Sequence, residues 1–197
     1  ALAANTTGVR NLAIGTSASL LNTIGTNNIA IGNTALRTNI SGSNNVAIGY
    51  SALYSSTVGS NTAIGLNAAS QNTTGTGIVA IGAGALQANT NGYNNVAIGN
   101  GTMNNSTIGT LNVAIGNEAL NANTTASNNV AIGANALNKN TTGEGNVAIG
   151  TNALATATTI GGQIAIGQDT LKDNTTGYQN IGIGAGAGTA ITTGHEN

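Results

Sequence analysis

The residues that could carry acid–base or nucleophilic chemistry are very few in this chain. Its only histidine is His195, and histidine is the base that proton transfer and nucleophilic catalysis most often use. Asp169 and Asp173 could form a carboxylate pair. Isolated titratable side chains of this kind are most often solvated surface residues. We expect that here, and we predict that the chain is not an enzyme.

Other chemical sites are excluded by residue type and by spacing. The chain has no cysteine, which removes disulfides, thiolate chemistry and cysteine–zinc sites. The glycine-rich stretch 182–188 lacks the G-x-G-x-x-G spacing, because Ala187 stands where the third glycine is needed, and no P-loop lysine follows. Calcium-binding β-roll repeats need a regular Asp in each unit, but the chain has two Asp in all. We predict no cofactor and no bound metal.

Charge and hydropathy narrow the range of partners. The net charge is −1, and only 5% of the residues are charged, against about 25% in ordinary domains. No basic patch points to nucleic acid, and no polybasic stretch points to an anionic lipid surface. No apolar run approaches the ~18 residues of a membrane helix. We expect neither nucleic-acid binding nor direct insertion of this segment into a membrane.

One tripeptide, Ala-Ile-Gly or once Gly-Ile-Gly, recurs eleven times and organises the whole chain. Successive copies are 17 residues apart, except for one spacing of 16 between Gly49 and Gly65. We number each unit, or rung, from its leading Asn, so that the consensus is Asn-Val-Ala-Ile-Gly-x-x-Ala-Leu-x-x-Asn-Thr-Thr-Gly-x-x. In residues 157–162, either Ile160 or Gly161 fills position 15. Residues 1–197 thus form one continuous array of about eleven and a half rungs, which we interpret as a window of a longer fibre.

Each rung is too short and too rich in glycine for packed helices, since helical repeats need ~33 residues or more. Val-Ala-Ile at positions 2–4 is β-branched and alternating, which favours a strand. Gly at position 5 and Asn-Thr-Thr-Gly at positions 12–15 favour turns. We expect a strand at positions 2–4, a second short strand around Ala-Leu at positions 8–9, and a return turn. Stacked in parallel about 4.8 Å apart, such rungs form an all-β parallel β-solenoid, or β-roll.

Stacking turns each rung position into a column of like side chains. Position 4 is Ile in all eleven rungs, position 2 is nearly always Val, Ile or Leu, and position 9 is usually Leu. Positions 2 and 4 point to one side of the strand, because side chains alternate along it. We expect these three columns to form the core of each rung.

Position 3 points to the other side of the strand and carries only the smallest residues. A solvated strand face would normally carry Thr, Lys, Glu or Asn, so an unbroken column of tiny residues suggests a close neighbour. We predict that this column packs against other copies of the chain. Its residues are Ala13, Ala30, Ala47, Ala63, Ala80, Ala97, Ala114, Ala131, Ala148, Ala165 and Gly182.

Three further columns bear on function. Position 1 is mostly Asn, and two explanations stand equally: amides that hydrogen-bond from rung to rung, or simple turn propensity. Position 13 is nearly always Thr, which could form a regular water-ordering face. Every charged residue and every tyrosine falls at a variable position, which indicates the solvent side. The candidate contacts for a receptor or glycan are the tyrosines Tyr50, Tyr54, Tyr93 and Tyr178.

The repeated Asn-Val-Ala-Ile-Gly motif resembles the head repeats of trimeric autotransporter adhesins, the YadA-like heads, whose repeat centres on a similar Ser-Val-Ala-Ile-Gly strand. The longer unit, with Ala-Leu and Asn-Thr-Thr-Gly, is similar to repeat arrays in phage tail-fibre-type proteins. The resemblance covers essentially the whole chain. It implies a left-handed β-roll, three chains around one axis and a role in surface attachment. The 17-residue unit is longer than the YadA-like one, which suggests an enlarged outer turn, and no binding residue carries over.

These patterns together predict a non-enzymatic structural fibre or adhesin segment, homotrimeric and extracellular, that forms or presents an attachment surface. Two settings are open, a bacterial cell surface and a virion tail fibre, with a host-surface receptor or glycan as the further partner. A self-assembling extracellular filament is one alternative. An ice-binding solenoid built on the Thr column is a weaker one.

Overall fold

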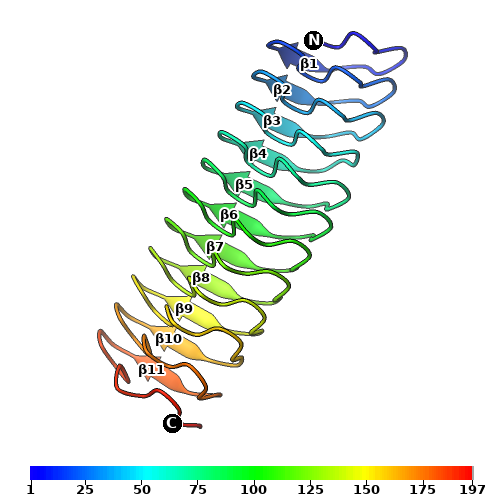
Figure 1. The fold of residues 1–197 in the computed structure, drawn as a ribbon. Coiled ribbons are helices and arrows are strands. Elements are labelled where there is room, and N and C mark those ends of the chain that lie inside the picture. Colours follow the sequence, from blue (N-terminus) through cyan, green and yellow to red (C-terminus); the bar gives the residue numbers. More distant parts are fainter. Residues whose placement is uncertain (197) are drawn as a thin grey trace.

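The chain folds into a single parallel sheet to which each rung contributes one short strand. The computed structural model describes residues 1–196. The strands follow one another in the sheet in chain order, and Figure 1 shows the rungs stacked as one rod with the two chain ends at opposite ends of it. The strands are β1 Leu12–Ile14, β2 Ile29–Ile31, β3 Val46–Ile48, β4 Thr62–Ile64, β5 Val79–Ile81, β6 Val96–Ile98, β7 Val113–Ile115, β8 Val130–Ile132, β9 Val147–Ile149, β10 Ile164–Ile166 and β11 Ile181–Ile183.

Like positions lie directly above one another along the sheet. Ala13 of β1 pairs with Ala30 of β2, and the same register continues strand by strand. It also holds across the spacing of 16 residues, where Ala47 of β3 pairs with Ala63 of β4. The prediction of an all-β parallel β-solenoid with 17-residue rungs is therefore confirmed.

The predicted second strand around Ala-Leu is wrong, because a series of turns takes its place in the described residues. Positions 7 and 9 have positive φ in every rung, as in Asn135 (φ 57°) and Leu137 (φ 51°). A strand needs negative φ at each residue, so left-handed residues at alternate positions break it. The segment still bonds to its neighbour rung, since the N–H of Leu137 donates to the carbonyl of Ala153 (3.0 Å).

Two irregular rungs keep the stack in register. The amide of the position 1 side chain usually donates to the position 15 carbonyl of its own rung. In the short rung, Asn45 donates to the carbonyl of Val58 (2.9 Å), so Val58 fills position 15 and the missing residue is that of position 14. In the ambiguous rung, Asn146 donates to the carbonyl of Ile160 (2.9 Å), which places Ile160 rather than Gly161 at position 15.

The interior of each rung is narrow and is filled mainly by small and amide side chains. Buried residues occupy position 3 on the strand, positions 8 and 9 across from it, and positions 1 and 12 beside the turns. In the rung 129–145 these residues, all 0% exposed, are Asn129, Ala131, Ala136, Leu137 and Asn140. The predicted core role of position 9 is confirmed.

The predicted core role of positions 2 and 4 is wrong, because their side chains point out of the rung. In β8, Val130 and Ile132 are half-buried, whereas Ala131 between them is fully buried. The same alternation runs through the internal strands from β2 to β10, and the core cluster contains the position 3 residues but none from positions 2 and 4. The strand therefore turns its small side chains inward and its large side chains outward, which is the opposite of the prediction made from side-chain size.

The cause of this facing is the lack of space inside the rung. A Cβ added at Gly182 would lie 2.7 Å from Cγ2 of Thr170 and 3.1 Å from Cγ of Leu171. Contacts that short force neighbouring atoms to move, so the interior accepts no more than a methyl group opposite positions 8 and 9. Branched side chains must then lie on the outer side of the strand.

Two columns of buried Asn hold the rungs together. At position 1, Nδ2 of Asn129 donates to the carbonyl of Gly143 (2.9 Å), and Oδ1 accepts from the backbone N–H of Asn146 in the next rung (2.9 Å). At position 12, Nδ2 of Asn140 donates to the same Gly143 carbonyl (2.9 Å). The rung-to-rung explanation of position 1 is confirmed, and position 12, assigned to a turn from sequence, is buried as well.

Candidate functional site

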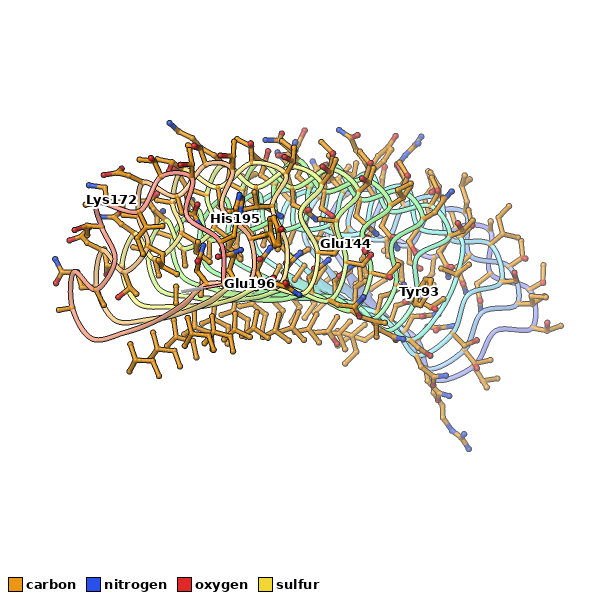
Figure 2. All side chains as sticks on the ribbon, turned by 90° about the horizontal axis from the view of Figure 1, so that it is seen from below. Tyr93, Glu144, Lys172, His195 and Glu196 are labelled. Carbon is orange, nitrogen blue, oxygen red and sulfur yellow. The ribbon has the colours of Figure 1, made fainter. Side chains whose placement is uncertain are left out.

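One face of the rod is covered by branched apolar side chains that do not belong to the core. They stand at positions 2 and 4 of the strands, and we call this surface the apolar face. Figure 2 shows a row of carbon-only side chains beneath the strands, and the labelled Tyr93, Glu144, Lys172, His195 and Glu196 lie outside that row. Thr62 is the one member with a hydroxyl group. The apolar face consists of Leu12, Ile14, Ile29, Ile31, Val46, Ile48, Thr62, Ile64, Val79, Ile81, Val96, Ile98, Val113, Ile115, Val130, Ile132, Val147, Ile149, Ile164, Ile166, Ile181 and Ile183.

The apolar face is regular and reaches solvent along its whole length. Its end residues are the most exposed, with Ile183 at 69% and Ile14 at 55%. Most residues of the inner rungs are half-buried, because neighbours in the same column cover them from two sides. Strands of three residues, stacked in this number, cover roughly 10 Å by 50 Å, or about 500 Å². Monomeric proteins rarely expose apolar patches above a few hundred Å², and larger ones are typical of protein–protein interfaces.

The column of small residues lies inside the rungs, so its predicted contact with other chains is wrong. From β2 to β10 these alanines are 0% exposed, the glycine of β11 is buried, and the alanine of β1 at the end of the sheet is half-buried. They are small because positions 8 and 9 press on them from within the same chain. The residues corrected in this way are Ala13, Ala30, Ala47, Ala63, Ala80, Ala97, Ala114, Ala131, Ala148, Ala165 and Gly182.

The Thr column at position 13 directs its hydroxyl groups to the backbone. The hydroxyl of Thr90 donates to the carbonyl of Thr107 (3.1 Å), and that of Thr124 donates to the carbonyl of Thr141 (3.1 Å). Most hydroxyl groups of the column therefore tie one rung to the next, and their protons are not free to order water. Ile40 also interrupts the column. This geometry weighs against the ice-binding alternative.

Tyr54 lines a hollow in the outer surface of the rod, at positions 7, 10 and 11 of two consecutive rungs. Nη1 of Arg37, one rung earlier, donates to the Tyr54 hydroxyl (3.0 Å), and its Cζ lies 5.6 Å from the centre of the tyrosine ring. The hollow has a volume of about 230 Å³, and its lining consists of Ser51, Tyr54, Ser55, Asn67, Ser70 and Gln71.

The other three candidate tyrosines lie in different rungs along the rod. Tyr50 is 56% exposed and Tyr93 is 48% exposed. Tyr178 stacks on His195, with ring centres 4.2 Å apart, and its backbone N–H donates to Nδ1 of that histidine (3.2 Å). The fold therefore does not gather the four tyrosines into one site.

Asp169, considered above as a candidate for acid–base chemistry, has a structural role between rungs. Its carboxylate accepts hydrogen bonds from Nδ2 of Asn152 (2.9 Å), one rung earlier, and from Nε2 of Gln168 (3.1 Å). These bonds lower the pKa of the Asp169 carboxyl below its ordinary value of 3.8. Lys172 lies 3.9 Å away. A carboxyl that is ionised this firmly is a poor proton donor near neutral pH.

Residues 1–196 bring no three His, Cys, Asp or Glu side chains together where they could hold a metal ion. The described part of the chain also has no helix of the length and apolar character needed to cross a membrane. The two surface features with a defined shape and chemistry are the apolar face and the hollow at Tyr54.

A scan against protein-family models found no match, and neither did searches of curated proteins and of solved structures. The resemblance to YadA-like heads and to phage tail-fibre repeats therefore rests on the Asn-Val-Ala-Ile-Gly motif and its spacing. What the structure adds is the fold, a parallel β-solenoid with an apolar face on its outside.

Proposed function

We propose that this chain is a segment of a homotrimeric structural fibre, in which three rods join through their apolar faces and present an attachment surface on their outer turns. The observation that carries the proposal is the apolar face, which the fold leaves outside its own core. Apolar surface in water costs roughly 25 cal/mol per Å². Association of the faces removes that cost along the whole rod.

The regular stacking favours identical partners over a different protein. In a closed symmetric assembly, the same patch of every chain takes part in the contact. Because each rung repeats the same two apolar positions, parallel copies in register would meet like residues at every level. The threefold number of chains and the left-handed coil come from the resemblance to YadA-like heads, and they are part of the proposal.

The variable surface supports a role in attachment. With the apolar faces turned toward a common axis, the outer turns of each chain stay in solvent. These turns carry the charged residues and the tyrosines, whereas the buried columns hardly vary. We place the fibre outside the cell, on a bacterial surface or on a virion tail, where a host-surface receptor or glycan would meet these turns. The proposal includes no catalysis.

The test is the mass of the assembly in solution, measured by sedimentation equilibrium. The wild-type chain should be a trimer. Replacing four neighbouring residues of the apolar face by Lys should give a folded monomer, because these side chains reach water in the single chain. The four residues are Val113, Ile115, Val130 and Ile132.

A matched control places four lysines on exposed residues of the same two rungs or of the rung before them, outside the apolar face. The control residues are Asn105, Asn117, Thr125 and Thr142. This variant should remain a trimer, and circular dichroism should show the same β signal in all three proteins. A wild-type monomer would overturn the proposal, as would a trimer that survives the apolar-face lysines. Long end-to-end polymers in electron micrographs would favour the filament instead.

A further inference from the structure

The hollow at Tyr54 combines one aromatic ring with five hydroxyl or amide side chains, and no charged group lines it. Its volume of about 230 Å³ lies below the ~300–1,000 Å³ of pockets for drug-sized ligands. The size and the neutral polar lining match a single small ring that has both an apolar face and several hydroxyl groups.

The hollow lies where short side chains line two consecutive rungs. Serine stands at positions 7 and 11 of the first rung and at position 10 of the second, as Ser51, Ser55 and Ser70. In three later rungs an Asn fills position 10. Nδ2 of Asn104, for example, donates to the carbonyl of Gly84 (2.9 Å) and closes that part of the surface. Small residues beside Tyr54 therefore leave space that an Asn fills in these rungs.

The Tyr54 ring is held in place from one side. Arg37, in the preceding rung, lies over the ring and donates to its hydroxyl. Position 10 of the following rung is the short Ser70, which lines the hollow with Tyr54. A ring clamped on one side and open on the other is a preorganised stacking surface, so a ligand need not pay to order it.

Polar groups in the hollow are available to a ligand. Ser55, Asn67, Ser70 and Gln71 line it, and none of their side chains has a hydrogen-bond partner among residues 1–196. Asn and Gln amides each offer two N–H donors and one carbonyl acceptor, and serine offers one donor and acceptor oxygen. These groups suit sugar hydroxyls, which donate and accept in the same way.

We propose that the hollow binds one pyranose ring of an uncharged glycan, with a face of the sugar on Tyr54 and its hydroxyl groups on Asn67 and Gln71. This inference deepens the attachment role proposed above and rests on it for its biological meaning. The cation beside the Tyr54 ring, Arg37, is engaged with the tyrosine hydroxyl, and that is why we assign a neutral sugar rather than an acidic one.

The experiment is saturation-transfer NMR on the intact chain with the methyl glycosides of glucose, galactose, mannose and N-acetylglucosamine as probes. Methyl glucuronide serves as the acidic comparator. We expect at least one neutral glycoside to bind with a millimolar dissociation constant, as is usual for a single weak subsite, and to bind more tightly than the glucuronide. If none of the four binds, or if only the glucuronide does, the proposal is wrong.

Two variants locate the site. Tyr54→Ser should weaken binding about tenfold or more, since tenfold corresponds to about 1.4 kcal/mol, and Gln71→Ala should weaken it several-fold. The control is Ile108→Ser, which removes a large exposed side chain outside the hollow and should leave binding unchanged. Equal binding by Tyr54→Ser and wild type would contradict the assignment.

The oligomeric mass of the same samples separates this inference from the proposed fibre. Because the hollow and the apolar face lie at different rung positions, Tyr54→Ser should keep the wild-type mass and the β signal of circular dichroism. A trimer without sugar binding would reject the hollow alone. Sugar binding by a chain that stays monomeric would reject the trimeric fibre and keep the hollow. If Tyr54→Ser loses the β signal, Gln71→Ala becomes the deciding variant, because the Gln71 side chain is exposed.

Discussion

The two sides of each strand carry apolar columns of equal regularity, but for different reasons. The inner side is the alanine column, which is fully buried from β2 to β10. The outer side is the apolar face, whose Val and Ile side chains reach solvent. The inner column is uniform because the space within the rung admits only a methyl group. The outer one has no such limit within the chain, and we propose that its uniformity reflects contact with a partner chain.

The largest effect should come from a charge on the inner side. Ala131→Lys places a long cation where the wild-type side chain is 0% exposed, and burial of an unpaired charge costs more than about 4 kcal/mol. We expect this variant to unfold locally or completely. The neighbouring Ile132→Lys should keep the monomer folded, as judged by urea denaturation followed by circular dichroism. Similar stability of the two variants would contradict the facing of the strand.

The side chain across from the inner column should matter nearly as much. Leu137→Ala removes a fully buried side chain next to the alanine column, and such truncations cost about 2–5 kcal/mol. Truncation of Val130 on the apolar face should cost clearly less in the monomer, because that side chain is only half-buried. Urea midpoints of both variants check this, and the comparison should be made at concentrations where the chain is monomeric.

The buried amides should show an intermediate effect. Asn129→Ala removes the bond to Gly143 and leaves the N–H of Asn146 without its acceptor. A buried polar group left without a partner costs about 1–3 kcal/mol. Asn117→Ala, at an exposed position in the preceding rung, is the control and should change stability little. Equal losses in the two variants would mean that the Asn column is not what ties the rungs.

A gain of stability should follow from repairing an interrupted amide column. Oδ1 of Asn89 is buried without a hydrogen-bond partner in the described residues, and position 12 of the next rung is Ser106 rather than Asn. In an uninterrupted pair, Nδ2 of Asn39 donates to Oδ1 of Asn22 (3.0 Å). Ser106→Asn should restore such a bond and add about 0.5–1.5 kcal/mol. A lower urea midpoint would show that the column has no room for it.

The smallest effect should be the pH dependence of the exposed surface. Hydrogen bonds from Asn152 and Gln168 lower the pKa of the Asp169 carboxyl below 3.8. The contribution of this carboxylate to the stability of the fold is therefore fully present above the pKa that Asp169 has in the unfolded chain. It is lost as the pH falls through the lower pKa that Asp169 has in the folded chain. Asp169→Asn should flatten the loss of stability below about pH 4 and change little at neutral pH. Thermal melts across this range, compared with Asp173→Asn, measure the effect.

Much of the fold follows from the repeat pattern, but the orientation of the strand does not. The spacing of Ala-Ile-Gly predicts the strands, their parallel register and the burial of position 9, all of which the structure contains. Alternation predicts that positions 2 and 4 share a side opposite position 3, and this is also correct. Which side faces inward depends on the width of the rung, and a single rung of sequence carries no measure of that width.

The candidate sites divide in the same way. The sequence alone places Tyr54 among the surface residues, because it stands at a variable position. The hollow beside it depends on Asn67, Ser70 and Gln71, which are 13 to 17 residues further along and become its neighbours only through stacking. The positive φ of positions 7 and 9, which turns an expected strand into bends, is likewise a consequence of closing the rung over a thin core.

Period, strand positions and turn positions are local properties, and so the order of residues is enough to specify them. The inward or outward direction of a column is a property of the packed coil, because it depends on how closely opposite walls of the rung approach. Those walls leave room for Ala and exclude Val and Ile. That exclusion puts the large apolar residues on the outside of the rod, where we infer that other chains cover them.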